Sequence, residues 1–245
     1  MRSSIPPPAH EWALFLDVDG TLVDIAPTPQ SIEVSVDLPQ LLARLARRFD
    51  GGLALVSGRC IADLDALFHP FRFPAAGIHG AERRDALGKL HYTGLTSADL
   101  EPVRTELRRF ARRHPAVLLE DKGRSIALHF RQAPELAAAV YAALEAARVQ
   151  LPPGTHLQPG HYVIEVKGSA SSKRAAVEQF LQEPPFAGRV PVYVGDDLTD
   201  LEALAYVKSV GGNGVFVGPE PMAGHHSLPH AAAVRDWLRS LEPPK

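Results

Sequence analysis

Strand-like runs that stop at polar residues recur at four places in this chain. The stretches are LFLDVDGT (14–21), LALVSGR (53–59), SASSKRAAV (169–177) and VYVGDDLTD (192–200). Helical patterns lie between them, such as segment 37–49 with leucines on one face. This alternation of strand and helix implies a parallel sheet, so we predict an α/β fold.

The pattern changes after about residue 84 and resumes near 171. The intervening segment predicts two helices and three strands, at 98–113, 116–120, 124–131, 134–148 and 161–167. Beyond it the α/β pattern predicts further elements at 172–182, 190–194, 198–207, 214–217 and 230–241. We therefore predict a core made of 1–84 and 168–245, interrupted by an inserted α+β domain, 85–167, which we call the cap.

Composition excludes several classes of protein. The 245 residues are 45% hydrophobic with a net charge of −2, so a sizeable core is expected and a nucleic-acid partner is not. No apolar run is long enough to cross a membrane or to form a secretory signal. The single cysteine, Cys60, excludes an intrachain disulfide and fits a reducing compartment. We expect a cytoplasmic monomer without a membrane partner.

The DVDGT stretch carries two carboxylates separated by one residue. In an extended segment, Asp17 and Asp19 point the same way and enter one pocket, and Gly20 permits the sharp turn that follows. Carboxylates 4 Å apart repel by about 1 kcal/mol in water and about 4 kcal/mol at an effective dielectric of 20. A cation between them, or a proton on one, offsets that cost. Both conditions suit phosphoryl transfer; a surface acidic turn is the alternative.

Two further stretches carry groups that bind phosphate. Ser57 follows an apolar run, and Gly58 leaves backbone N–H groups accessible just before a helix start. Lys173 lies in the first turn of a predicted helix, where it opposes the helix dipole, so pairing with phosphate and Asp17 would explain its place. Taken singly, an ordinary N-cap serine and a surface lysine explain these residues equally well or better.

The GDDLTD stretch crowds Asp196, Asp197 and Asp200 into one strand-to-helix turn. Acidic residues are favoured near a helix N-terminus, which accounts for Asp197 and Asp200. It does not account for Asp196 at the strand tip. Mg²⁺ prefers oxygen ligands and often takes only one or two protein carboxylates, so Asp17 and Asp196 with the Asp19 backbone carbonyl would suffice. The four stretches together predict a magnesium-dependent, phosphate-transferring enzyme.

These stretches resemble the four motifs of the haloacid dehalogenase-like phosphatase superfamily, over nearly the whole chain. The resemblance implies a Rossmann-like core with its site at the carboxyl ends of the strands. It implies that Asp17 forms an aspartyl-phosphate, that Asp19 is the general acid/base, and that Lys173 assists catalysis. Phosphate contacts fall to Asp17, Thr21, Ser57, Gly58 and Lys173. The implied Mg²⁺ ligands are Asp17, the backbone carbonyl of Asp19 and Asp196. Asp197 and Asp200 are expected next to these ligands, without direct contact with the metal.

A closer resemblance is to the trehalose-6-phosphate phosphatases. It rests on GIHGAE (77–82), LLEDKGRSIALHFR (118–131), HYVIEVK (161–167) and GDDLTDLEAL (195–204). In that family the cap reads the sugar of a small phosphosugar substrate, and strand alternation is consistent with a polar face on the cap. The implied sugar contacts are His79, Glu82, Glu120, Lys122, His129, Arg131 and Glu165. The chain departs from the family at Gly168, often proline, and at Arg174, often glycine.

Three alternatives stay open at this point. Another phosphosugar phosphatase, acting on sucrose- or mannosylglycerate-type phosphates, would share the chemistry and differ on the cap. A phosphosugar mutase would pass the phosphoryl group to a sugar rather than to water. A binding protein without turnover belongs to a different class, and it is disfavoured because every expected catalytic side chain is present.

Overall fold

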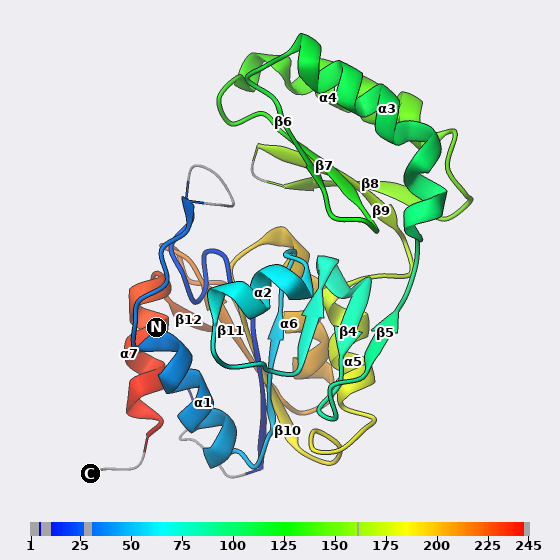
Figure 1. Cartoon of the computed structure of the whole chain (residues 1–245). Helices are drawn as coiled ribbons and strands as arrows, with labels where there is room; N and C mark the ends of the chain where they lie inside the picture. Colours follow the sequence, from blue (N-terminus) through cyan, green and yellow to red (C-terminus); the bar gives the residue numbers. More distant parts are fainter. Residues whose placement is uncertain (1–4, 6–10, 27–30, 161, 243–245) are drawn as a thin grey trace. The chain divides into compact units, whose positions relative to one another are not determined.

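The computed structural model describes residues 5, 11–26, 31–160 and 162–242. The chain divides into two compact units, Met1–His91 with Lys173–Lys245, and Tyr92–Ser172 (Figure 1). The sequence pattern predicts these boundaries near residues 84 and 167. The first boundary lies later because strands β4 (Glu82–Arg84) and β5 (Leu90–Tyr92) continue the sheet of the first unit.

The first unit is built on an eight-stranded sheet with the order β12-β11-β10-β1-β2-β3-β4-β5. From β12 to β3 all pairings are parallel, and β4 runs antiparallel to β3. The predicted α/β class with a parallel sheet is confirmed. The remaining strands of this sheet are β1 (Trp12–Leu16), β2 (Leu53–Val56), β3 (Ala75–Gly77), β10 (Val190–Gly195), β11 (Asn213–Val217) and β12 (His226–Leu228).

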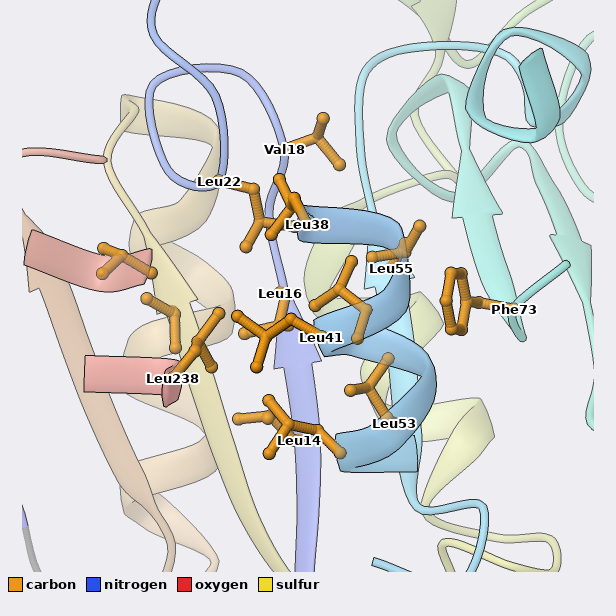
Figure 2. Close-up of a cluster of buried hydrophobic side chains, with 14 of the residues drawn as sticks. Leu14, Leu16, Val18, Leu22, Leu38, Leu41, Leu53, Leu55, Phe73 and Leu238 are labelled. Atoms are coloured by element: carbon orange, nitrogen blue, oxygen red, sulfur yellow. The ribbon is translucent and has the colours of Figure 1, made fainter. Parts of the chain in front are cut away.

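Helices cover both faces of this sheet, so central strands such as β1 and β2 are apolar and buried throughout. Leu14 and Leu16 of β1 pack on one face with Leu41 and Leu238, from α1 and α7 (Figure 2). Their neighbour Phe15 points to the other face and packs with Phe180 and Phe186. The helices of this unit are α1 (Leu38–Arg48), α2 (Ile61–Leu67), α5 (Lys173–Phe180), α6 (Leu201–Ser209) and α7 (Ala231–Ser240).

The order of the strands fixes where a site can form. Strand β1 is central, with β2 on one side and β10 on the other. The chain runs from β1 to β2 on one side and adds β10 and β11 on the other, so the winding reverses beside β1. In open α/β sheets ligands bind outside the carboxyl ends of the strands at such a reversal. Asp17, Ser57 and Asp196 follow these three strands directly.

The second unit is a four-stranded antiparallel sheet with the order β6-β7-β9-β8. Apolar side chains of one sheet face, including Ile126, Leu128 and Val166, pack with Leu107 and Leu144 from its two helices. The elements are α3 (Ser97–Arg113), β6 (Leu118–Asp121), β7 (Ile126–His129), η3 (Pro134–Leu136), α4 (Ala137–Arg148), β8 (Thr155–Gly160) and β9 (Val163–Gly168).

The prediction of three strands for this unit was wrong, because it omitted β8. The β8 sequence THLQPG contains proline and glycine, which argue against a strand interior. Strand β8 lies at the edge of the sheet, where a missing proline N–H is tolerated. Strands β4, β5 and β12 were also not predicted, since each has only three residues and no apolar alternation.

The two ends of the second unit meet at a pair of glycines. A Cβ placed on Gly168 would lie 3.1 Å from the Gly94 Cα and 3.1 Å from the Leu95 nitrogen. Such a contact is tighter than ordinary van der Waals packing, so this position favours the smallest residue. The departure from proline at residue 168 thus has a local structural reason. Within the described part of the chain, no helix is long and apolar enough to span a membrane.

Candidate active site

The centre of the candidate site is a buried lysine held between two aspartates. Asp17 directly follows β1, and its backbone N–H donates to the Val194 carbonyl at 3.0 Å. Lys173, the first residue of α5, donates through Nζ to Asp17 Oδ1 and to Asp200 Oδ1, each at 2.7 Å. The lysine is only 3% exposed, which excludes the unremarkable surface lysine considered from the sequence.

Asp200 has its whole acceptor capacity in use. Its Oδ1 accepts from Lys173 and from the Tyr193 hydroxyl. Its Oδ2 accepts from the backbone N–H groups of Asp196 and Asp197, at 3.1 and 2.9 Å. An ionised carboxylate offers about four acceptor positions, so Asp200 is a fixed anion that holds both the lysine and the turn.

Three carboxylates converge beside this lysine. Asp17, Asp196 and Asp200 each place an oxygen within 4.8 Å of the others. Since Asp200 is already occupied by four donors, Asp17 and Asp196 are the two that have the capacity to hold a cation. Thr21 donates to Asp196 Oδ1 at 3.0 Å and orients it. A Cβ on Gly20 would lie 2.1 Å from Asp196 Oδ2, so glycine is required there, and its φ of +83° requires it too.

The electrostatics of this cluster favour a cation. Burial, and then the Asp200 carboxylate, raise the pKa of Asp17 well above its ordinary value, although Lys173 opposes the shift. Burial and Asp200 likewise raise the pKa of Asp196 to about 6. Burial lowers the pKa of Lys173, but its two carboxylate partners outweigh burial and raise it. Three carboxylates with one ammonium thus leave negative charge that a hard divalent ion would neutralise.

Asp19 is held by an arginine that the sequence analysis did not place in the site. Arg59 donates through Nε to Asp19 Oδ2 and through Nη2 to Asp19 Oδ1, both at 2.8 Å. This two-bond geometry is the strongest and most directional form of a carboxylate ion pair. Arg59 belongs to the VSGR stretch, after β2, whereas Asp19 lies in the loop after β1. The separation of two residues in a single sequence does not show that they form a pair, so this contact could not be predicted.

Ser57 and its neighbours form a tight turn at the end of β2. Ser57 is fully buried, and its Oγ accepts from the backbone N–H of Arg59 at 3.1 Å. The N-cap of α2 is Cys60, whose Sγ accepts from the Asp63 N–H at 3.4 Å, so Ser57 is not the helix cap. A Cβ on Gly58 would lie 2.7 Å from His79 Nε2, so any larger residue here would displace the His79 ring.

Other predicted residues of this unit have structural partners. Asp197 caps the short helix η4 (Leu198–Asp200), where its Oδ1 accepts from the Leu198 N–H. Glu82 accepts through Oε1 from the backbone N–H of Ile61 at 3.1 Å. His79 and its neighbour form a turn with positive φ in the short helix η2 (Ile78–Gly80).

The second unit carries its own polar cluster. Across the sheet, Glu120 pairs with Ala127 and Ala127 with Glu165, so the two glutamates share one face. His129 Nε2 lies 2.8 Å from Glu120 Oε2. Lys122 Nζ lies 3.4 Å from Glu165 Oε2 and 3.7 Å from Glu120 Oε2. The structure therefore brings four of the predicted sugar contacts together.

Two details of this cluster differ from the sequence analysis. Ser125, which the analysis did not name, is fully buried and donates to Glu165 Oε1. Arg131 is exposed beyond the end of β7, and its guanidinium lies 5.5 Å from the Tyr162 ring centre. Strand alternation does not extend to Arg131, because β7 ends at His129, so its place among the sugar contacts stays a prediction.

Comparison with known proteins decides the family. The trehalose-phosphatase family profile matches residues 15–227. The trehalose-6-phosphate phosphatase of Escherichia coli is 41% identical over 236 residues, covering 96% of this chain and 88% of the relative. The chain belongs to the trehalose-phosphatase family. The resemblance inferred from the motifs is thereby confirmed, and the chain belongs to a family of phosphoric monoester hydrolases.

Solved structures agree with the fold expected for this family. The C-terminal domain of the trehalose-6-phosphate phosphatase of Candida albicans matches with a TM-score of 0.75 and 20% identity, covering 94% of this chain and 91% of that one. A haloacid dehalogenase-like hydrolase from Bacillus subtilis matches with a TM-score of 0.62 and 15% identity, covering 95% and 100%. At these identities the likeness shows the fold alone, and it confirms the haloacid dehalogenase-like core.

Proposed function

We propose that this family member is a magnesium-dependent phosphatase that hydrolyses trehalose 6-phosphate to trehalose and phosphate through an aspartyl-phosphate on Asp17. The observation that carries the proposal is the buried Asp17–Lys173–Asp200 arrangement, which fixes one carboxylate beside a permanent positive charge. The relative named above, at 41% identity, supports the choice of substrate.

In the first half-reaction a carboxylate oxygen of Asp17 attacks phosphorus. The bond between phosphorus and the sugar oxygen breaks, and the protonated Asp19 gives its proton to that oxygen. Lys173 neutralises charge on the transferring phosphoryl group from a fixed, desolvated position. Trehalose leaves, and the phosphoryl group stays on Asp17.

In the second half-reaction water attacks the phosphorus of the aspartyl-phosphate. Asp19, now a carboxylate, accepts a proton from that water as the bond between phosphorus and Asp17 breaks. Inorganic phosphate is released and Asp17 returns to its carboxylate form. The Ser57 hydroxyl, the Gly58 backbone and Thr21 are the proposed contacts that keep the phosphoryl group in place.

The oxygen donors of the site fit a hard divalent cation. Asp17 and Asp196, with the Asp19 backbone carbonyl, are the proposed ligands of Mg²⁺, and Asp197 and Asp200 stand behind them. When bound, the ion would supply positive charge that lets an anionic nucleophile approach a phosphate dianion. The raised pKa values of Asp17 and Asp196, caused by burial and by the Asp200 carboxylate, support this assignment.

We assign sugar recognition to the polar face of the second unit. Glu120, Lys122, His129 and Glu165 are linked there by hydrogen bonds and ion pairs, so their side chains are already oriented for hydroxyl groups. Lys122 and Glu165 are the preferred contacts. His79 and Glu82 of the first unit remain proposed contacts at its rim. A free thiol at Cys60 fits a cytoplasmic enzyme.

The test is phosphate release from trehalose 6-phosphate, sucrose 6-phosphate, glucose 6-phosphate and mannosyl-3-phosphoglycerate, with Mg²⁺ and with EDTA. Mg²⁺-dependent preference for trehalose 6-phosphate is the expected result. Preference for another sugar would keep the chemistry and discard the proposed substrate. Transfer of phosphate to a sugar without free phosphate would identify a mutase, and binding without turnover would overturn the proposal.

A further inference from the structure

A strained turn lies beside the phosphate-binding turn of the first unit. Ile78 and His79 have φ values of 49° and 52°, in the left-handed region. That region is uncommon for any residue other than glycine, and it is a clear outlier for a β-branched residue such as isoleucine. Strain of this kind persists only where the surroundings over-determine the backbone, and it clusters at functional sites.

Backbone hydrogen bonds tie this turn to the segment that carries Ser57 and Arg59. The Ile78 N–H donates to the Arg59 carbonyl at 2.8 Å, and the His79 N–H donates to the Ser57 carbonyl at 2.9 Å. Just beyond the turn, Glu82 accepts from the Ile61 N–H at 3.1 Å. Three contacts thus join segment 78–82 to segment 57–61, and two of them depend on the left-handed residues.

Close packing reinforces these bonds. A Cβ on Gly77 would lie 2.8 Å from the Arg59 carbonyl oxygen and 2.9 Å from the Ile61 nitrogen. A Cβ on Gly58 would lie 2.7 Å from His79 Nε2. Each segment therefore has a glycine where the other approaches, so neither can shift without the other.

The segment held in this way aims one side chain. Arg59 is 9% exposed, and its guanidinium meets both oxygens of Asp19 at 2.8 Å. Asp19 belongs to the loop after β1, whereas Arg59 follows β2. The strained turn therefore fixes the Arg59 backbone, and the Arg59 backbone fixes the position of the guanidinium that holds the Asp19 carboxylate.

We propose that segment 77–82 braces Arg59, and that Arg59 is a positioning residue that holds the Asp19 carboxylate for proton transfer. This inference rests on the proposed function, in which Asp19 is the acid/base. It gives the GIHGAE segment a role inside the first unit, separate from any contact with the sugar.

The choice of leaving group provides the test. Trehalose 6-phosphate needs a proton on its leaving oxygen, so its turnover depends on Asp19 in both half-reactions. With p-nitrophenyl phosphate the phosphorus–oxygen bond breaks to give a stable phenolate that needs no proton, and only hydrolysis of the aspartyl-phosphate depends on Asp19. A displaced Asp19 therefore spares the first half-reaction with this substrate alone.

Arg59→Met, with Mg²⁺ present, is the first variant. We expect its kcat with trehalose 6-phosphate to fall by about 100-fold or more, the range that acid–base catalysis contributes. With p-nitrophenyl phosphate we expect a rapid burst of one phenolate per enzyme molecule, followed by slow turnover. Arg59→Lys keeps the charge but not the two-bond geometry, and we expect an intermediate result.

Arg84→Met is the matched control. Arg84 is also 9% exposed and makes a two-bond pair with Asp65, at 2.7 and 2.6 Å, away from the site. We expect this variant to lose stability and to show no burst. Absence of the burst with p-nitrophenyl phosphate in Arg59→Met, or unchanged kinetics, would overturn the assignment of Arg59.

Gly77→Ala tests the brace while leaving Arg59 intact. Its Cβ would push the strained turn away from the Arg59 carbonyl, so we expect the same burst with a smaller loss on trehalose 6-phosphate. Unchanged kinetics in this variant would overturn the brace. If the wild-type enzyme released neither phosphate nor phenolate, the proposed function would fail instead, which separates the two failures.

Discussion

The two units differ in how deeply their charged side chains are buried. In the first unit, Asp17, Lys173 and Asp200 are at most 3% exposed, and they come from loops and a helix start at the carboxyl ends of parallel strands. In the second unit, Glu120, Lys122 and His129 lie partly exposed on the face of an antiparallel sheet. The first arrangement fixes charges for chemistry, and the second presents them to a ligand.

This difference in burial predicts which substitutions each unit tolerates. A buried charge with all its partners in place becomes costly when one partner is removed, because the remaining charge cannot reach water. A partly exposed charge, such as that of Glu120 or His129, keeps some access to water, so its loss costs mainly the contacts that it makes with a ligand. Changes in the first unit are therefore expected to abolish activity or stability, and changes in the second to alter selectivity.

The sharpest test of the first unit is Asp17→Asn. Removing the nucleophile should lower kcat with trehalose 6-phosphate by about 10⁴-fold or more, since no other group forms the covalent intermediate. Phosphate release under saturating Mg²⁺ measures this. Asp24→Asn, a change to an aspartate with a 74% exposed side chain, serves as the control and should leave kcat unaltered.

Asp200→Asn tests the claim that the buried network is rigid and costly to break. The variant leaves Lys173 with one charged partner and places an amide among N–H donors, so the free energy of unfolding should fall by about 3 kcal/mol. Urea denaturation measures the change. A loss below about 1 kcal/mol would mean that the network tolerates the loss of one charged partner and that the contrast with the second unit is wrong.

The raised pKa of Asp196 predicts a pH dependence of stability opposite in sign to that of Glu120 in the second unit. At Glu120, burial is outweighed by the His129 hydrogen bond and by Lys122, which lower the pKa. Because the pKa of Asp196 is raised to about 6 in the folded state, the folded state binds more protons than the unfolded state between about pH 4 and 6. Stability should therefore fall as pH rises through that window, by at most about 3 kcal/mol. Melting temperatures in EDTA measure this decline. It should be smaller in Asp196→Asn, where Asp17 still has a raised pKa, and smaller still when Mg²⁺ is added.

Glu165→Gln tests the second unit. It keeps the size of the side chain but removes the charge that pairs with Lys122, so kcat/KM with trehalose 6-phosphate should fall by roughly 10–100-fold. With p-nitrophenyl phosphate, which has no sugar, kcat/KM should stay as in the wild type. Glu145→Gln, on an exposed part of α4, is the control in the same unit. Equal losses on both substrates would remove the proposed division of labour.

The smallest effect is expected for Arg131→Ala. Arg131 is exposed and lies over Tyr162 rather than within the polar cluster, so kcat/KM with trehalose 6-phosphate should change by no more than about threefold. A loss as large as that of Glu165→Gln would place Arg131 in the sugar site and would restore the expectation from the sequence.

The sequence was most informative where chemistry and strand ends coincide. Asp17, Lys173, Asp196 and Asp200 could be placed in one site, because short apolar runs predict parallel strands whose ends share one edge. Arg59 could not be assigned to Asp19, since that pair joins loops from two strands through tertiary packing alone. The Tyr193 hydroxyl was missed for a related reason: a tyrosine in a buried strand has the pattern of ordinary core.

Strand alternation had a similar limit in the second unit. It placed Glu120, His129 and Glu165 on one polar face correctly, because period-two alternation holds inside a paired strand. It does not decide the place of Arg131, because the paired strand β7 ends at His129. Strand β8 was hidden by its own proline and glycine, which only an edge position makes tolerable.

The contact between Gly94 and Gly168 brings the two ends of the second unit together, so the unit can be exchanged as a whole. The chain enters and leaves it at one point, so its ends are already as close as two strands of a hairpin. Insertions with adjoining ends disturb their host least, because the host chain closes over the same short gap whatever the insert contains. Replacing the second unit as one continuous segment at this junction would thus change which substrates undergo the same phosphoryl chemistry, and it would leave the parallel sheet and its aspartates unaltered.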